Sequence, residues 1–294
     1  VVDMVKSKNI ISKIIVNAIL AVVACGTLLP FLLIVATSFT GDENIRRYGY
    51  SFILREINFD AYKYILDNPK QIIDAYKMTI FTTAVGTLGG IFLTGMLSYT
   101  ISRKDFAMRG FLSFYIYFTM LFNGGLVASY IWNAKYLGLA NTPWAIILPL
   151  LMTPWDVFML RTYFSGIPVA LIESAKLDGA SEFRIFFTII VPLAKTGIAT
   201  IALLLLFRYW NDWFNSMLYM DTTKYMTIQY YLVKVLNNVE FVKNNQATVG
   251  TSIEVPDESV RMALCVVAAG PMTIIFPFFQ KYFVKGLVVG SVKG

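Results

Sequence analysis

Histidine is absent from this 294-residue sequence, and cysteine and charged residues are scarce. Without histidine the chain has no His-based metal site, no histidine proton relay, and no Ser/His or Cys/His catalytic arrangement. The two cysteines, Cys25 and Cys265, lie in separate apolar runs, so they provide neither zinc-ligand spacing nor a disulfide framework. These absences exclude the corresponding kinds of enzyme.

Charged residues make up 15% of the chain, against roughly 25% in soluble domains, while hydrophobic residues make up 57%. This shortage is typical of a surface that faces lipid, because a charge in the bilayer core is costly. A net charge of +7 would favour a nucleic-acid partner in a soluble protein. In this chain we assign the charge to the basic loops of a membrane protein and expect no nucleic-acid partner.

Six segments reach the length of about 20 apolar residues that a membrane-spanning helix needs. We therefore predict an all-α, polytopic membrane protein with residues 1–294 in a single transmembrane domain. The first apolar run is too long for a cleaved signal peptide, so we expect it to be retained. The predicted spans are Ile11–Ser38, Asp74–Thr100, Gly110–Trp132, Pro143–Tyr163, Thr188–Tyr209 and Val260–Tyr282.

Lysine and arginine in short loops indicate the orientation of the chain. The 101–109 loop carries Arg103, Lys104 and Arg109, whereas the 133–142 loop carries only Lys135. Each terminal segment also carries three lysines. Positively charged short loops stay in the cytoplasm. We therefore expect the inner (cytoplasmic) membrane, with both termini cytoplasmic.

Outside the membrane, apolar residues at helical spacing predict short interfacial helices within Asn58–Lys77 and Met226–Val242. Asn244–Ser259 is predicted to be an irregular loop before the last span. Within the second span, the spacing of Gly86 and Gly90 allows another helix to approach closely.

One compact, charged segment, ESAKLDGASEFRIFF from Glu173 to Phe187, lies between the fourth and fifth spans. The residues before it from Pro168 have helical spacing, Gly179 can adopt the positive φ of a sharp turn, and Ser181 can cap a second helix. On the predicted cytoplasmic side, two short helices that meet at a glycine favour docking to another protein. A solvated loop without a partner is the alternative.

This segment, with the following I-V-P-L of Ile190–Leu193, closely resembles the EAA loop of ABC-importer permeases, E-A-A-x-x-x-G followed by I-x-L-P. Glu173, Ala175, Gly179, Ile190 and Pro192 match, while Ser174 and Val191 replace an alanine and a leucine. Arg208–Met220 and Phe276–Gly294 resemble MalG-type carbohydrate permeases. The sequence YFSGIP…ESAKLDGA is most similar to the LplC/YtcP branch, which is associated with complex or acidic oligosaccharides such as alginate.

The resemblance implies a type I ABC-importer permease fold with a coupling loop at 165–187. It also implies the import of sugars or oligosaccharides, with acidic (uronate) oligosaccharides included. It implies a second permease subunit, two ATPase subunits and an extracytoplasmic solute-binding protein as partners. The chain has no Gly-Lys dipeptide and hence no phosphate-binding P-loop, so ATP and Mg are expected on the ATPase subunits. No cofactor, metal or enzyme activity is expected on this chain. The residues implied in ATPase coupling are Glu173, Ser174, Ala175, Asp178, Gly179, Ala180 and Phe183.

Candidates for a sugar pathway lie near the outer ends of the spans, because aromatic rings stack on sugars and polar groups bind their hydroxyls. An interfacial aromatic belt explains the same residues. Asp156 follows Pro154 within the fourth span, where a carboxylate is a functional candidate. A pair with Arg161, or with a donor near a kink at Pro154, is the alternative. The other pathway candidates are Tyr130, Trp132, Arg208, Trp210, Asn211, Asp212, Trp213 and Asn215.

Two other functions stay open at this point. An ion-coupled secondary transporter would explain six spans and a buried acid, but it leaves the charged segment at Glu173–Phe187 unexplained. An ABC permease for a solute other than a sugar is the second. Dependence of uptake on ATP rather than on membrane potential separates an ABC permease from an ion-coupled transporter.

Overall fold

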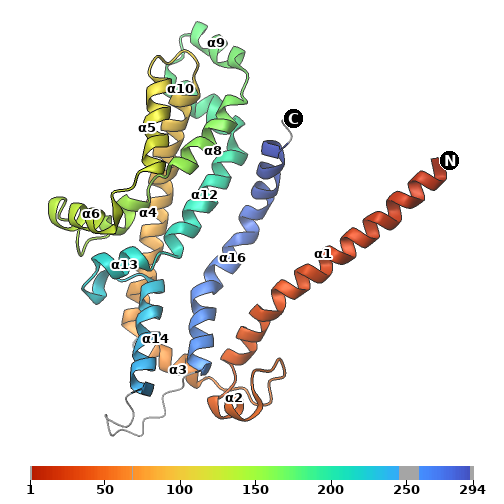
Figure 1. The fold of residues 1–294 in the computed structure, drawn as a ribbon, viewed down its shortest axis with the longest axis vertical. Helices are drawn as coiled ribbons and strands as arrows, with labels where there is room; N and C mark the ends of the chain where they lie inside the picture. Colours follow the sequence, from red (N-terminus) through yellow and green to blue (C-terminus); the bar gives the residue numbers. More distant parts are fainter. Residues whose placement is uncertain (1, 68, 245–257, 292–294) are drawn as a thin grey trace. The chain divides into compact units, whose positions relative to one another are not determined.

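The computed structural model describes residues 2–67, 69–244 and 258–291, and the regular elements among these residues are helices (Figure 1). Three helices are long and apolar enough to cross a membrane, over Ser12–Ser38, Pro69–Ser102 and Glu258–Phe278. Three pairs of shorter helices meet the same criteria as bent spans, so the described residues contain up to six spans by length and composition. The predicted all-α architecture is confirmed, while the loop predicted at Asn244–Ser259, except for its ends, lies outside the described residues.

The chain divides into two compact units, of which the first contains Val1–Pro69 and Val235–Gly270. Tyr62 hydrogen-bonds Ser38 at 2.8 Å and stacks on Phe39, which fixes a short helix against the end of the first span. The backbone N–H of Ser259 donates to Asp42 at 2.8 Å. The helices that lie wholly in this unit are α1 (Val2–Ser38), α2 (Asp42–Tyr48) and α3 (Asp60–Leu66).

The second unit contains Lys70–Lys234 and Pro271–Gly294. Helices α14 (Ile228–Asn244) and α16 (Glu258–Ser291) are divided between the two units. The remaining elements are α4 (Pro69–Ser102), α5 (Arg109–Leu121), α6 (Gly125–Ile131), the π-helix η1 (Trp132–Tyr136), α7 (Trp144–Leu150), α8 (Pro154–Ser165), α9 (Val169–Leu177), α10 (Glu182–Ile185), the π-helix η2 (Phe186–Ile190), α11 (Val191–Leu193), α12 (Lys195–Trp210), α13 (Phe214–Tyr219) and the 3₁₀-helix η3 (Thr223–Tyr225).

The predicted external helices are only partly separate elements. Helix α3 lies before Asp67 as expected, but the stretch after it belongs to the first turns of the long helix α4. Helix α14 covers most of Met226–Val242, and Ile228, Leu232 and Val239 of its apolar stripe are buried. Burial of that stripe supports α14 by tertiary packing rather than by propensity alone.

The third, fourth and fifth spans are bent, by 111°, 51° and 86°. The first bend follows Asn123, and Gly125 there has a φ of +83°. At the second, Pro154 opens α8 and Thr153 caps it by accepting the N–H of Asp156. Before the third, η2 widens the helix upstream of Pro192, because a proline ring clashes with the carbonyl four residues earlier in a regular helix.

Close packing at Gly86 and Gly90 is confirmed. A side chain at Gly86 would overlap the ring of Tyr209 on α12, and a Cβ at Gly90 would lie 2.6 Å from the carbonyl oxygen of Leu151. The Tyr209 hydroxyl passes α4 and donates to the carbonyl of Ile147 at 2.7 Å. The glycines of α4 therefore allow α12 to reach α7, and they serve packing within the bundle.

Candidate functional site

The turn between α9 and α10 has the predicted geometry. Gly179 has a φ of +78°, and the N–H of Ala180 donates to the carbonyl of Ala175 at 2.9 Å. The Ser181 hydroxyl accepts from the N–H of Arg184 at 3.3 Å and caps α10. We call Val169–Ile185, which comprises α9, this turn and α10, the elbow. It lies at the end of the α4, α5, α8 and α12 bundle (Figure 1).

The inner face of the elbow is anchored in the hydrophobic core of the second unit. Ile172, Ala175 and Ile185 are buried in one cluster with Tyr99 and Phe186. Ala180 packs against the same cluster. The small side chains of Ala175 and Ala180 therefore serve packing inside this chain, and the elbow is a rigid part of the bundle.

The outer face of the elbow exposes apolar surface together with acidic groups. Leu177 is 89% exposed and Phe183 is 61% exposed. The predicted coupling residues Glu173, Ser174, Asp178 and Gly179 are exposed beside them. Sequence reasoning missed Leu177, although it lies two residues after the inward-facing Ala175 and hence on the opposite side of α9.

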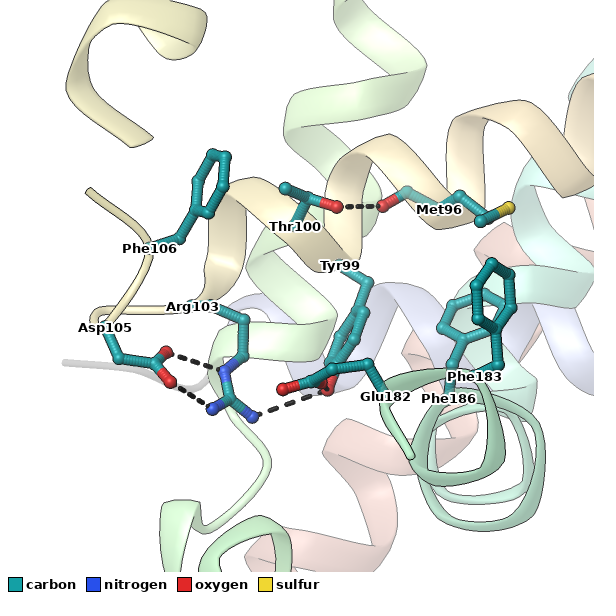
Figure 2. Close-up of a pocket in the computed structure, with 9 residues that line it drawn as sticks. All are labelled: Met96, Tyr99, Thr100, Arg103, Asp105, Phe106, Glu182, Phe183 and Phe186. Carbon is teal, nitrogen blue, oxygen red and sulfur yellow. Dashed lines mark hydrogen bonds and ion pairs between the residues drawn. The ribbon is translucent and has the colours of Figure 1, made fainter. Parts of the chain in front are cut away.

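Five side chains form a closed ring that ties both arms of the elbow to the end of α4. Figure 2 shows four of them, Tyr99, Arg103, Asp105 and Glu182. Arg103 donates to both oxygens of Asp105, at 2.8 and 2.6 Å. Lys176 of α9 pairs with Asp105 at 3.2 Å and with Glu182 of α10 at 2.7 Å. Tyr99 donates to Glu182 at 2.7 Å and accepts from Arg103 at 3.4 Å. We call these residues the ionic ring.

The charges of the ionic ring persist across ordinary pH. The Arg103 guanidinium holds the pKa of Asp105 well below its usual range, and the hydrogen bond to Glu182 raises the pKa of Lys176. The lowered pKa of Asp105 means that its contribution is present above about pH 4 and is lost only as pH falls through the lower folded value. The raised pKa of Lys176 means that its contribution is lost only above about pH 10. Between these limits the ring is constant.

A cavity of about 320 Å³ lies beside the ionic ring. Arg103, Asp105 and Glu182 form part of its polar wall (Figure 2). Its apolar wall is formed by Met96, Phe106, Phe183 and Phe186. Because this cavity is lined by Phe183 of α10 and by Met96 of α4, the apolar packing between the two helices is incomplete there. The ionic ring supplies contact between α10 and α4 at this place.

Asp156, the candidate within the fourth span, pairs with Arg208 instead of Arg161. Arg208 donates to its two oxygens at 2.8 and 3.2 Å, and Asp156 is completely buried. Arg208 also donates to the carbonyl of Leu150 at 3.4 Å, at the end of α7. Arg161 instead donates to Ser113 at 3.4 Å.

The Asp156–Arg208 pair closes the break between α7 and α8. A broken helix leaves carbonyls without intrahelical partners, and these need other donors when they are buried. Arg208 and Tyr209, neighbours in the last turn of α12, donate to Leu150 and Ile147 of α7. Much of the charge of Arg208 is thus compensated by Asp156, although its side chain stays 24% exposed.

The other pathway candidates fall in two further contact groups. Tyr130 stacks on Tyr219 of α13 with ring centroids 5.8 Å apart, and Asn133 donates to the same tyrosine hydroxyl at 3.1 Å. Asp212 accepts from the backbone and side-chain nitrogens of Asn215, at 3.3 and 2.8 Å.

Exposure separates the remaining members of this set. Trp210 is 4% exposed, whereas Trp132 and Trp213 are 59% and 42% exposed. Asn211 is exposed and donates to the carbonyl of Phe207 at 3.0 Å. Trp132 and Trp213 are therefore accessible to a ligand or to lipid, while Trp210 is a packing residue.

Bent helical spans that end in an elbow with an exposed outer face indicate a multi-pass membrane protein. Comparison with known proteins gives the family. Residues 86–289 match the model of the binding-protein-dependent transport system inner membrane component. The chain belongs to this family, so it is a permease subunit and not itself an enzyme.

Two relatives match along more than nine tenths of the chain. It is 34% identical to the polygalacturonan/rhamnogalacturonan transport system permease protein YtcP of Bacillus subtilis, over 98% of this chain and 100% of the relative. It is 35% identical to protein LplC of the same organism, over 91% and 90%. These matches confirm the resemblance to ABC-importer permeases and exclude the ion-coupled transporter.

A solved structure has the same fold. It is a bacterial ABC transporter involved in the import of the acidic polysaccharide alginate, and one of its chains matches this chain with a TM-score of 0.79 and 28% identity. The match covers 93% of this chain and 96% of that chain. The bends of the spans therefore belong to an architecture that is already known for an ABC importer.

Proposed function

We propose that this chain is the permease subunit of an ATP-driven importer of acidic oligosaccharides. Several relatives are named for a sugar cargo. The polygalacturonan/rhamnogalacturonan permease and the alginate transporter, at 34% and 28% identity, handle acidic polymers, while relatives named for arabinooligosaccharides and for trehalose/maltose are 26% and 27% identical. These cargoes support sugar over other solutes, and the two acidic ones support acidic over neutral sugar. Arg208 adds little to this preference, because Asp156 compensates much of its charge.

We propose three kinds of partner: a second permease subunit, two ATPase subunits, and an extracytoplasmic solute-binding protein. ATP and Mg bind to the ATPase subunits, and this chain carries no cofactor of its own. The elbow is the contact to one ATPase. The single observation that carries this assignment is its two-faced structure, with Ile172 and Ala175 buried in the core while Leu177 stands 89% exposed. Apolar surface rimmed by polar groups is typical of protein-binding sites, and the exposed Leu177 and Phe183 beside acidic residues support this assignment.

The side chains of Glu173 and Asp178 complete the contact. Glu173 is exposed on α9 and available for a basic residue of the ATPase, and Asp178 ends α9 beside Gly179. Both termini and the 101–109 loop lie in the cytoplasm, on the same side as the elbow. The basic residues of that loop support this orientation.

Uptake by the complete assembly tests the proposed cargo. With both permeases, both ATPases and the binding protein in proteoliposomes, we expect ATP-dependent uptake of radiolabelled oligogalacturonate or oligoalginate. The matched control is the same oligosaccharide with its carboxylates reduced to alcohols. Uptake of the acidic form should exceed that of the reduced form by at least about tenfold, roughly 1.4 kcal/mol of discrimination.

Two results would count against the proposal in different ways. Equal uptake of acidic and reduced oligosaccharides would reject the acidic cargo while leaving the sugar importer intact. Uptake that follows an imposed membrane potential without ATP would reject the ATP-driven importer itself.

A further inference from the structure

Coupling between an ATPase and a membrane bundle needs a stiff connection between the docking element and a span. The elbow reaches α4 by two routes, which are the apolar cluster that its Ile172, Ala175 and Ile185 share with Tyr99, and the ionic ring. The cavity beside Phe183 leaves the apolar route incomplete. The ionic ring is therefore needed to complete the connection between the elbow and α4.

The connectivity of the ionic ring is closed. Both oxygens of Asp105 and both oxygens of Glu182 are engaged, and Lys176 joins the two carboxylates. Tyr99 and Arg103 complete the circuit on α4 and in the loop after it. A bidentate arginine–carboxylate pair fixes orientation as well as distance.

The elements that the ring joins are the ones that must move together. Lys176 lies on α9 and Glu182 on α10, so their contact bridges the turn at Gly179. Asp105 and Tyr99 then bind these two arms to the end of the second span. Because one contact holds the two arms of the turn together and two others attach these arms to α4 and its following loop, the elbow cannot rotate without displacing α4.

We propose that Arg103 and Asp105, which lie about 65 residues before the elbow, are positioning residues for coupling, because the ionic ring makes the elbow and α4 one mechanical unit. This inference rests on the proposed contact between the elbow and an ATPase. A displacement of α9 and α10 by the ATPase is transmitted to the cytoplasmic end of α4 through Lys176 and Glu182. Loss of one ring member leaves the elbow docked but lets it tilt independently of the span.

The test measures how many substrate molecules are imported for each ATP hydrolysed by the assembled transporter. Asp105→Asn and Arg103→Gln should each lower this ratio by about fivefold, in the range by which connecting residues modulate coupling between sites. The amount of ATPase subunit that copurifies with the variants should match the wild type. Lys104→Gln is the matched control, because it removes a charge from an exposed residue of the same loop outside the ring.

A covalent replacement of the ring separates stiffness from charge. In a chain whose Cys25 and Cys265 are replaced by alanine, Asp105→Cys together with Lys176→Cys removes two ring members. A short bifunctional thiol reagent then links α9 to the loop after α4. We expect the ratio to fall in the unlinked double variant and to recover toward the wild-type value after cross-linking.

The outcomes are distinguishable from failure of the proposed function. If the wild-type assembly imports nothing with ATP, the proposed function fails. If the wild type does so and Asp105→Asn and Arg103→Gln keep its ratio, the ring proposal alone is overturned. A reduced ratio that cross-linking does not restore also overturns it, because the charges would then act by a route other than stiffness.

Discussion

Replacing Gly179 with proline should abolish ATP-driven uptake while the chain still inserts and binds its partner permease. The φ of Gly179 is +78°, whereas proline fixes φ near −65°. The substitution therefore forces the turn between α9 and α10 to open and moves the outer face of the elbow away from its partner. We expect uptake to fall by roughly tenfold or more, because the displaced elbow no longer contacts the ATPase in the geometry that transmits its motion to the spans.

Asparagine and alanine at the same position supply the controls. No atom lies within 4 Å of a Cβ built at Gly179, so a side chain itself meets no obstacle there. Asparagine tolerates the left-handed conformation, whereas alanine pays roughly 1–2 kcal/mol to adopt it. The expected order of uptake is therefore wild type, Gly179→Asn, Gly179→Ala and Gly179→Pro. Proteoliposome uptake by equal amounts of assembled complex measures it, and a proline variant as active as the asparagine variant would contradict the role of the turn.

Arg208→Met should produce the largest loss of stability of any substitution considered for this chain. It would leave the completely buried carboxylate of Asp156 without its partner and remove the donor to Leu150. Removing one member of a buried ion pair costs about 3–5 kcal/mol. The unfolding midpoint of the detergent-purified permease should fall accordingly, and Arg161→Met, whose partner is the hydroxyl of Ser113, should cost much less.

The double variant Asp156→Leu with Arg208→Met separates a structural role from a role in sugar binding. Replacing a buried ion pair by apolar residues of similar volume is often close to neutral for stability. We therefore expect most of the lost stability to return, and uptake to return with it. A double variant that is as unstable as Arg208→Met would show that the pair is not the source of the effect. A stable double variant without uptake would assign the pair to the sugar pathway.

The sequence was sufficient for the number of spans and for the turn at Gly179, because both depend on local properties. Apolar length marks a span, and glycine between two helical patterns marks a reversal. A kink at Pro154 was expected, but the bends near Asn123 and Pro192 were not predicted. A proline is compatible with a kink or with a helix start, and only the packing around it decides between the two.

The partner of Asp156 illustrates a different limit. Arg161 lies five residues away on the same helix, which places the two side chains roughly 140° apart around the axis. Helix geometry alone disfavours that pair, but it cannot identify Arg208, which lies 52 residues along the chain. The ionic ring has the same character, since Tyr99 and Glu182 are 83 residues apart. Such contacts follow from the fold and leave no periodic signal in the sequence.

The side of the membrane on which Leu177 lies tests the central claim, that the elbow faces the cytoplasm and docks on an ATPase. In a chain with Cys25 and Cys265 replaced by alanine, Leu177→Cys provides one exposed thiol for a membrane-impermeant maleimide. In intact cells we expect no labelling, in inside-out vesicles of the permease alone we expect full labelling, and added ATPase subunits should protect the thiol. Labelling from outside intact cells would contradict the orientation, and equal labelling with and without the ATPase would contradict the docking.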